Sequence, residues 1–369
     1  MQRISVSNLQ PGMVVGRNVY DASGKLLLAS GFSLNQQFIQ GLLQLGINSI
    51  YVENNLLEEE QVTDVLREET RVMAIKSVKE CFANYGLMKK RVDVDKIKVA
   101  ASHIVDEIIL NPAAMVQLTD IRTHDDYTFA HSVNMCSLAV LLAASIGYNQ
   151  AHLKDLALGA LLHDIGKVEI SNEILNKPMQ LDDSEWRIMH HHPMAGFQIL
   201  KKQGNIPAPS MIVCYAHHER YDGAGYPRGV AGEEIHEYAR LAAIADVFDA
   251  VTADRPYRPA LMLHEAYDLL MASSGTHFDP RLLAKFLQSI AVYPVGSVVE
   301  LSNGAIAVVK AVHPGIAWRP SVQLLADAAM NTAVRGEAID LRETLSITVR
   351  KVFREREVLA LMKQLNLPW

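Results

Sequence analysis

The chain has 369 residues, of which 49% are hydrophobic and 21% charged, a composition that predicts a folded protein and excludes a disordered one. Its formal net charge of −6 provides no basic face for general binding of nucleic acid, so a duplex-binding protein is excluded. The three cysteines are scattered and match no disulfide pattern, as expected in a reducing cytoplasm. Residues 1–10 lack the apolar core of a signal peptide, and the apolar stretch 137–146 is too short to span a bilayer. We therefore expect a cytoplasmic protein without a membrane span.

Residues 1–56 are predicted to form a small α+β domain. Short apolar runs, such as Val19-Tyr20 and Leu26 to Leu28, are separated by turn residues, which is typical of short strands. A helix is expected from Asn35 to Leu45, where Gly46 ends it.

Residues 57–120 are predicted to form a connector of two helices. The first is expected to begin at the acidic run Glu58 to Glu60 and to reach Lys89. The second is expected from Val94 to Leu110, shortly before Pro112. The connector is a candidate for a dimer contact or for carrying a signal, and a plain packing role explains its pattern equally well.

Residues 121–290 have a helical apolar pattern throughout, and residues 291–369 change to period two. Val298 to Leu301 and Ile306 to Val309 predict a hairpin, and a short helix is expected at 355–365. The predicted fold class is mainly α, with an all-helical core between the small N-terminal α+β unit and a small C-terminal β appendix.

The histidines are concentrated in the helical core. Most of the 14 fall between His124 and His218, beside carboxylates, which favours metal chemistry over isolated buried histidines. His131 and Asn134 are three residues apart on one helix and share a face. On its own, this pair is typical of a polar group satisfied inside a core.

A more specific motif is His163-Asp164, which follows directly after the buried apolar helix Leu153 to Leu162. Burying both side chains without a partner would be costly, and a metal ion removes that cost. Lys167 follows His163 by four residues and lies on the same side if the helix continues, where it can balance the charge of a phosphate.

Four further segments carry residues suited to this chemistry. Histidines occur at 190–192 and at 217–218, and two glycines in the loop 220–227 allow a ligand to approach the backbone. Asp246 and Asp249 share a helix face, and two arginines follow that can bind phosphates bidentately, Arg255 and Arg258.

Together these motifs resemble the HD-GYP branch of the HD metal-dependent phosphohydrolases. His163-Asp164 is similar to the HD signature, and His217 to Pro227 looks like the extended loop that defines the branch. The resemblance covers residues 121–290. The segment before it resembles, more weakly, the small domain that precedes HD-GYP domains in many bacterial proteins.

The resemblance implies two divalent metal ions, iron or manganese, with Asp164 bridging them. Some members hold a third metal through a Glu four residues before the first histidine, and here that position is Tyr127. Lys167 would stabilise the scissile phosphate, and the substrate would also contact Tyr226, Arg255 and Arg258. The implied metal ligands are His131, His163, Asp164, His192, His217, His218 and Asp246.

The implied activity is hydrolysis of cyclic di-GMP to pGpG, with further cleavage to GMP left open. One alternative is another nucleotide phosphohydrolase of the HD superfamily, which the Gly-Tyr-Pro loop disfavours. A second is a non-catalytic sensor of cyclic dinucleotides, which a missing ligand would have favoured. A homodimer and contacts with other signalling proteins both stay open as partners.

Overall fold

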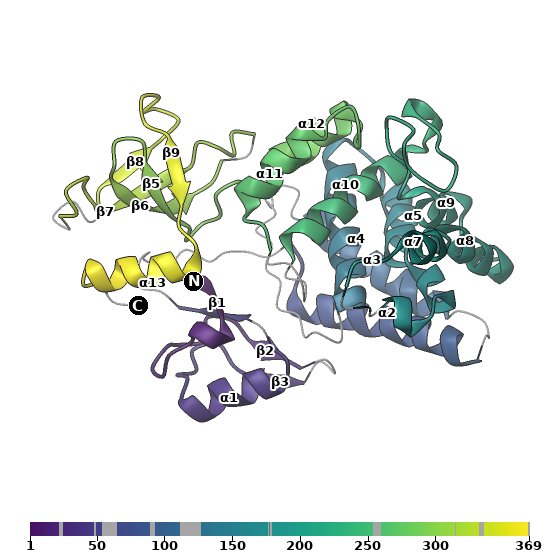
Figure 1. Ribbon diagram of the computed structural model, residues 1–369, viewed down its shortest axis with the longest axis horizontal. Coiled ribbons are helices and arrows are strands. Elements are labelled where there is room, and N and C mark those ends of the chain that lie inside the picture. Colours follow the sequence, from purple (N-terminus) through teal and green to yellow (C-terminus); the bar gives the residue numbers. More distant parts are fainter. Residues whose placement is uncertain are drawn as a thin grey trace. The chain divides into compact units, whose positions relative to one another are not determined.

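The chain folds into two compact units in a computed structural model (Figure 1). One unit combines residues 1–64, 115–127 and 288–369, and the other combines 65–114 and 128–287. The structure describes residues 1–21, 25–47, 49–53, 65–88, 93–110, 127–175, 177, 179–253, 260–313, 315–331 and 336–367.

The N-terminal segment of the first unit contains two short antiparallel strand pairs and one helix. β1 (Gln2–Ser5) pairs with β4 (Ser49–Val52), and β2 (Val19–Tyr20) pairs with β3 (Leu26–Leu28). The predicted helix is confirmed as α1 (Gln36–Gln44). The Asn35 side chain caps it by accepting a hydrogen bond from the backbone N–H of Phe38, at 3.0 Å.

The C-terminal segment forms an antiparallel sheet in the order β8-β7-β6-β5-β9, followed by α13 (Glu355–Gln364). The predicted hairpin is confirmed as the pairing of β5 with β6. Glu355, at the start of α13, accepts hydrogen bonds from Ser5 and Asn8, so both chain ends belong to the same unit. The strands are β5 (Val298–Leu301), β6 (Ile306–Ala311), β7 (Ser321–Ala326), β8 (Ala338–Asp340) and β9 (Val349–Val352).

The second unit is helical in the residues that the structure describes, as the sequence predicts. Its connector helices are α2 (Glu68–Met88) and α3 (Val94–Leu110). The core adds α4 (Tyr127–Ser145), α5 (Gln150–Leu161), the 3-10 helix η3 (Ile165–Glu169), α6 (Asn172–Leu175), α7 (Asp183–Met189), α8 (His192–Gln203), α9 (Ala208–Ala216), α10 (Glu237–Thr252), α11 (Leu263–Ala272) and α12 (Pro280–Gln288).

The start of the first connector helix differs from the prediction. Residues 58–60 lie outside the described part of the chain, and residues 65–67 are not helical, so α2 begins at Glu68. The backbone N–H of Arg67 donates to the Glu107 carboxylate at 2.9 Å, which fixes the chain just before the helix. Glu68 and Glu69 then occupy the first turn, where carboxylates interact favourably with the helix dipole.

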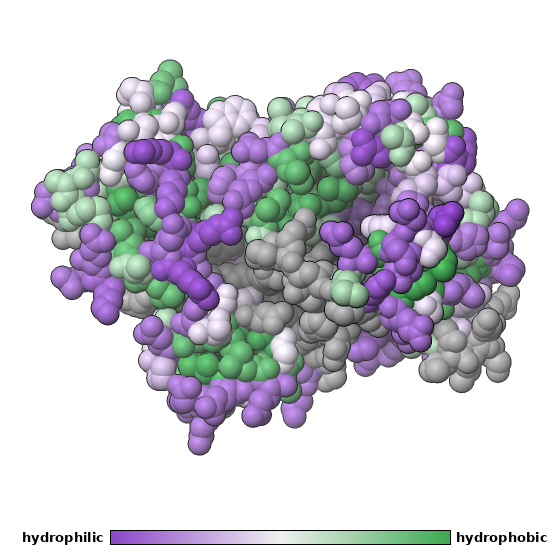
Figure 2. Space-filling model, in the orientation of Figure 1, coloured by the Kyte–Doolittle hydropathy of each residue, from purple (hydrophilic) through white to green (hydrophobic). Residues whose placement is uncertain are grey.

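The apolar helix α4 runs through the helical unit. Among the described residues, its window Thr128–Ser145 is long and apolar enough to cross a membrane, with a mean hydropathy of 1.4. However, 72% of that window is buried inside the protein, as for the core helix of a globular domain. Hydrophilic side chains line much of the outer edge of this unit in the face shown in Figure 2. The window is therefore weak evidence for a span.

Two glycines allow η3, α8 and α9 to approach one another closely. A Cβ atom on Gly166 would lie 1.9 Å from the backbone oxygen of His192, and one on Gly196 would lie 2.5 Å from the Cys214 sulfur. Any larger residue at either position would push these segments apart. The close packing places His163-Asp164, just before η3, beside the first residue of α8.

We expect Gly166→Ala to destabilise the helical unit by about 1–3 kcal/mol, because the added methyl group overlaps a backbone atom. The variant should also bind divalent metal more weakly, since the displaced backbone carries His192. Thermal melting and metal titration measure the two effects. Gly41→Ala in α1 is the control, because nothing lies within 4 Å of its added Cβ. Unchanged melting of Gly166→Ala would contradict the packing argument.

Candidate metal centre

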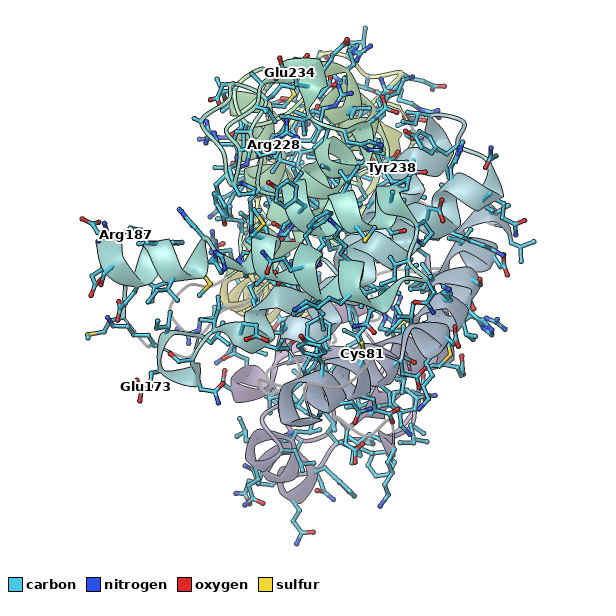
Figure 3. The ribbon with its side chains drawn as sticks, turned by 90° about the vertical axis from the view of Figure 1, so that its right-hand side faces the viewer. Cys81, Glu173, Arg187, Arg228, Glu234 and Tyr238 are labelled. Carbon is cyan, nitrogen blue, oxygen red and sulfur yellow. The ribbon has the colours of Figure 1, made fainter. Side chains whose placement is uncertain are left out.

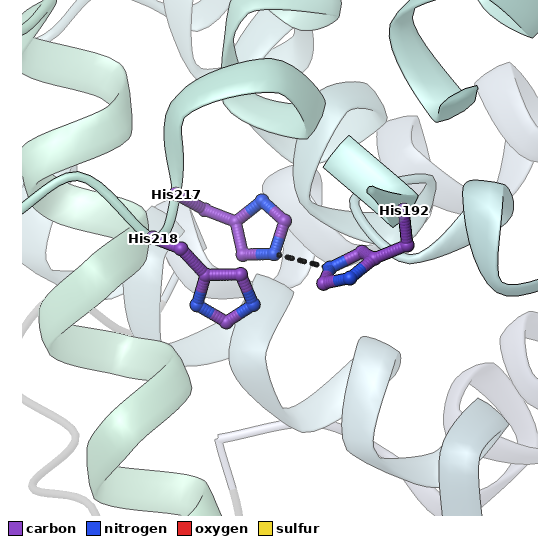
Figure 4. Close-up of side chains that lie close together, drawn as sticks. All are labelled: His192, His217 and His218. Carbon is purple, nitrogen blue, oxygen red and sulfur yellow. Dashed lines mark hydrogen bonds between the residues drawn. The ribbon is translucent and has the colours of Figure 1, made fainter. Parts of the chain in front are cut away.

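Histidines and carboxylates from separate helices meet inside the helical unit. Two groups have ligand atoms within 4.8 Å of one another, one with His192, His217 and His218 and the other with His131, His163 and Asp164. Figure 4 shows the rings of the first group pointing toward one another, with the His192 and His217 Nε2 atoms 3.5 Å apart. The folding of α4, α8, α9 and the turn before η3 therefore gathers motifs that lie far apart in the sequence.

Backbone carbonyl groups orient three of these rings. His163, His192 and His217 each have Nδ1 at 2.7 to 3.1 Å from a carbonyl oxygen of the preceding helical turn. Such a bond places the proton on Nδ1 and leaves Nε2 free to coordinate a metal. Burial lowers the pKa of His192 to about 3 and that of His218 to about 4, so both rings are neutral at pH 7. Neutral imidazole is the form that binds metals.

Asp164 belongs to the second group and also faces His192 of the first. Its Oδ2 is 3.3 Å from the Nε2 of His163, and its Oδ1 is 3.4 Å from the Nε2 of His192. Burial alone would raise the pKa of Asp164, but electrostatic interactions with His163 and Lys167 hold it well below its usual value. The carboxylate is therefore ionised, with one oxygen directed toward each group.

The polar atoms of the site suit a divalent cation. Among the described residues, His163 Nε2 and Asp164 Oδ1 are buried and have no hydrogen-bond partner. Leaving such atoms unsatisfied is costly, and metal coordination satisfies both. Imidazole nitrogens combined with carboxylate oxygens are a donor set that iron, manganese and zinc accept. The residues present therefore fit metal ions.

The His131 ring is held by two carboxylates of α10. Its Nε2 lies 3.0 Å from Asp246 Oδ1, and its Nδ1 lies 2.7 Å from Asp249 Oδ2. Burial would lower the pKa of His131, but hydrogen bonds to both carboxylates raise it to about 9. Asp249 therefore orients the ring through Nδ1, while Nε2 faces Asp246 and the centre.

Two further side chains support Asp249. The Asn134 amide donates to Asp249 Oδ1 at 3.1 Å, and Arg71 of the connector helix α2 donates to the Asn134 oxygen at 2.7 Å. A chain of hydrogen bonds thus links the connector to His131. The sequence indicated that His131 and Asn134 share a face, and the structure shows that Asn134 acts on the ring through Asp249.

We expect Asp249→Ala to weaken metal binding by roughly 10–100-fold, because the His131 ring loses the carboxylate that orients it. Metal titration of the metal-free variant, followed by isothermal calorimetry, measures this change. Asp268→Ala removes the same charge from an exposed position of α11 and should leave metal affinity at the wild-type level. Equal metal affinity in the two variants would contradict the orienting role.

The loop after His217-His218 is fixed by a buried carboxylate. Glu219 accepts hydrogen bonds from the backbone N–H groups of Arg228 and Gly229 at 2.7 and 3.0 Å. A Cβ atom on Gly225 would lie 2.3 Å from the backbone nitrogen of Arg220, so only glycine fits there. The loop thereby places the Tyr226 ring 4.8 Å from the His218 ring, at the edge of the centre.

The structure brings together all the sequence-predicted ligand positions, and it places Tyr226 and Lys167 beside them. The predicted helix does not continue through Lys167: α5 ends at Leu161, and Lys167 lies in η3. This 3-10 turn brings the Lys167 Nζ to 2.5 Å from Asp164 Oδ2.

The predicted substrate-binding residues Arg255 and Arg258 lie outside the described residues. The sequence did not reveal that Arg71 supports the centre through Asn134, because no motif marks its position. It also did not reveal that Asp249 orients His131, although the spacing of Asp249 from Asp246 placed both on one helix face.

Comparisons with known proteins agree with this centre. The family model described as "HD domain" matches residues 106–282, and that of a "KOW domain associated with HD domain" matches 298–361. A cyclic di-GMP phosphodiesterase of Pseudomonas aeruginosa is 37% identical over 245 residues, which is 65% of this chain and 59% of the relative. The 3′3′-cGAMP-specific phosphodiesterase 3 of Vibrio cholerae is 39% identical over 168 residues, 46% of this chain and 36% of the relative. This chain therefore spans less than two thirds of each relative's length.

The fold has a counterpart among solved structures. The HDG"Y"P protein Bd1817 of Bdellovibrio bacteriovorus superimposes with a TM-score of 0.52, at 20% identity, over 78% of this chain and 98% of that chain. At this identity the similarity concerns the fold alone, and it agrees with the predicted helical core and small flanking units. Residues 106–282, which contain the His-Asp centre and the Gly-Tyr-Pro loop, match the HD-domain family.

Proposed function

We propose that this chain is a metal-dependent phosphodiesterase that hydrolyses cyclic di-GMP to pGpG. The observation that carries the proposal is Asp164, a buried, ionised carboxylate with one oxygen directed toward each histidine group. The name of the Pseudomonas aeruginosa relative supplies the substrate class.

Two divalent ions, iron or manganese, would be held by the two histidine groups together with Asp164, whose oxygens face His163 and His192. His131, His163 and Asp246 surround one side of this carboxylate, and His192, His217 and His218 surround the other. Ions held there would supply Lewis acidity to a phosphodiester and to the water that attacks it. The rings of His192 and His218, which are uncharged at pH 7, leave the cationic charge of the ions available to an anionic substrate.

Side chains around the centre are proposed to bind the substrate. The Lys167 ammonium group lies beside Asp164 and is partly exposed, so it can also donate to a phosphate oxygen of the substrate. Tyr226 borders the centre through its contact with His218. Arg255 and Arg258 are proposed from the sequence to bind the substrate's phosphates, which their planar guanidinium groups match in shape.

A second candidate substrate is 3′3′-cGAMP, which appears in the name of the Vibrio cholerae relative. Incubation of protein loaded with Fe(II) or Mn(II) with each dinucleotide, followed by chromatography, tests both. We expect linear pGpG from cyclic di-GMP, and the ratio of the two kcat/KM values measures the preference between the dinucleotides. Tight binding of cyclic di-GMP without any linear product would contradict the proposal and identify a non-catalytic sensor.

A further inference from the structure

A row of aromatic rings leads from the candidate metal centre to the surface. It consists of His218, Tyr226, His190 and Trp186, and is called the aromatic row below. The ring centroids of successive members are 4.8, 3.9 and 5.4 Å apart. His190 and Tyr226 are stacked, with only 18° between their planes. The row therefore connects a candidate metal ligand to Trp186 through three successive ring contacts.

The outer end of the row is presented by α7. Trp186 lies on this helix and is 47% exposed, and His190 follows it by four residues, on the same face. Figure 3 shows the helix that carries Arg187 projecting from the body of the helical unit. The exposed part of the Trp186 ring is therefore accessible to a ligand.

Polar contacts fix α7 in this position. Asp182 and Glu185 form a capping box at its start. The Lys177 ammonium group also donates to both oxygens of Glu185, at 2.6 and 2.5 Å. Trp186 directly follows Glu185, so the indole is attached to a helix start that is held from two sides.

We propose that the aromatic row is a subsite for a purine base of the substrate, with Trp186 as its outer stacking surface. This inference rests on the proposed function, because it takes the scissile phosphate to lie at the metal centre. A cyclic dinucleotide carries a purine on either side of each phosphate, so one base then lies beside the centre. Tryptophan faces bind bases by stacking, with little dependence on base identity.

The kinetic test compares Trp186→Ala with wild type on two substrates. One is cyclic di-GMP, and the other is methyl p-nitrophenyl phosphate, a phosphodiester without a purine. We expect the ratio of the two kcat/KM values to fall about tenfold in Trp186→Ala, mainly through a higher KM for cyclic di-GMP. Trp186→Phe, which keeps an aromatic face, should recover most of the loss. An unchanged ratio, or a loss that Phe does not recover, would overturn the subsite.

Two control variants separate stacking from general effects of substitution. Ile188→Ala removes a side chain of α7 with the same 47% exposure, from a different face of the helix. Trp318→Ala removes a 52% exposed indole from the other unit. Both should keep the wild-type ratio, and a tenfold fall in either would overturn the assignment to Trp186.

Binding of cyclic di-GMP measured by tryptophan fluorescence distinguishes failure of the subsite from failure of the proposed function. If metal-loaded wild type hydrolyses neither substrate, the proposed activity is wrong. Quenching that persists in Trp318→Phe and is lost in Trp186→Phe would then still support the subsite. Identical quenching in Trp186→Phe and wild type would overturn the subsite, whether or not the protein hydrolyses the dinucleotide.

Discussion

Asp164→Ala should abolish hydrolysis of cyclic di-GMP, lowering kcat by roughly 10³-fold or more. Asp164 has one oxygen facing His163 and the other facing His192, which belong to different histidine groups. Its removal takes away the anionic ligand that the two groups share. The Lewis acidity of bound ions is worth several kcal/mol, which corresponds to a loss of this size. Steady-state kinetics and elemental analysis of the same preparation measure activity and metal content together.

Asp155→Ala is the matched control for this variant. Asp155 is a partly buried carboxyl group of α5 in the same unit, and its backbone oxygen, which accepts a hydrogen bond from Ser210, survives the substitution. It should keep wild-type activity and metal content. Circular dichroism should show Asp164→Ala folded. Wild-type turnover by folded Asp164→Ala would contradict the role of Asp164 as the ligand shared by the two groups.

Asp279→Ala should destabilise the helical unit by about 3–5 kcal/mol, because it removes the buried counter-ion of Arg240 and leaves this guanidinium group with the more distant, partly exposed Glu237 at 3.9 Å. Asp279 Oδ2 accepts a hydrogen bond from Arg240 at 2.5 Å, and the two side chains are nearly inaccessible to solvent. Its Oδ1 accepts from the backbone N–H of Arg281 and so caps α12. Urea unfolding followed by far-UV circular dichroism measures the effect.

Glu233→Ala is the control, since it breaks the exposed ion pair with Arg281. Exposed pairs contribute at most about 1 kcal/mol, so this variant should unfold close to wild type. The double variant Arg240→Met with Asp279→Leu should recover part of the lost stability, because it removes both buried charges. Equal unfolding midpoints for Asp279→Ala and Glu233→Ala would contradict the importance of the buried pair.

Local patterns predicted most of the elements and the positions that converge on the centre. Asn35 and Gly46 marked the ends of α1, and the hairpin of β5 and β6 followed from the change to period two after residue 290. His163-Asp164 was recognisable because a polar pair directly follows an apolar helix. In each case the signal lies within a few residues, so it does not depend on how the chain packs.

Features that depend on long-range packing could not be read in this way. The contact of Ser5 with Glu355 joins the two chain ends, although nothing near either residue indicates a partner. The spacing of Asp246 and Asp249 predicted a common face, but which carboxylate orients His131 depends on how α4 meets α10. The tight packing at Gly166 is also tertiary, because a glycine in a sequence predicts a turn equally well.

The most direct test of the proposed two-metal phosphodiesterase activity is to measure hydrolysis as metal is added back. Metal-free protein is titrated anaerobically with Fe(II) or Mn(II), and bound metal and pGpG formation are measured in each sample. We expect no hydrolysis without metal and a plateau of activity at about two ions per chain. Full activity in metal-free protein, or a plateau at one ion, would contradict the proposed two-metal activity.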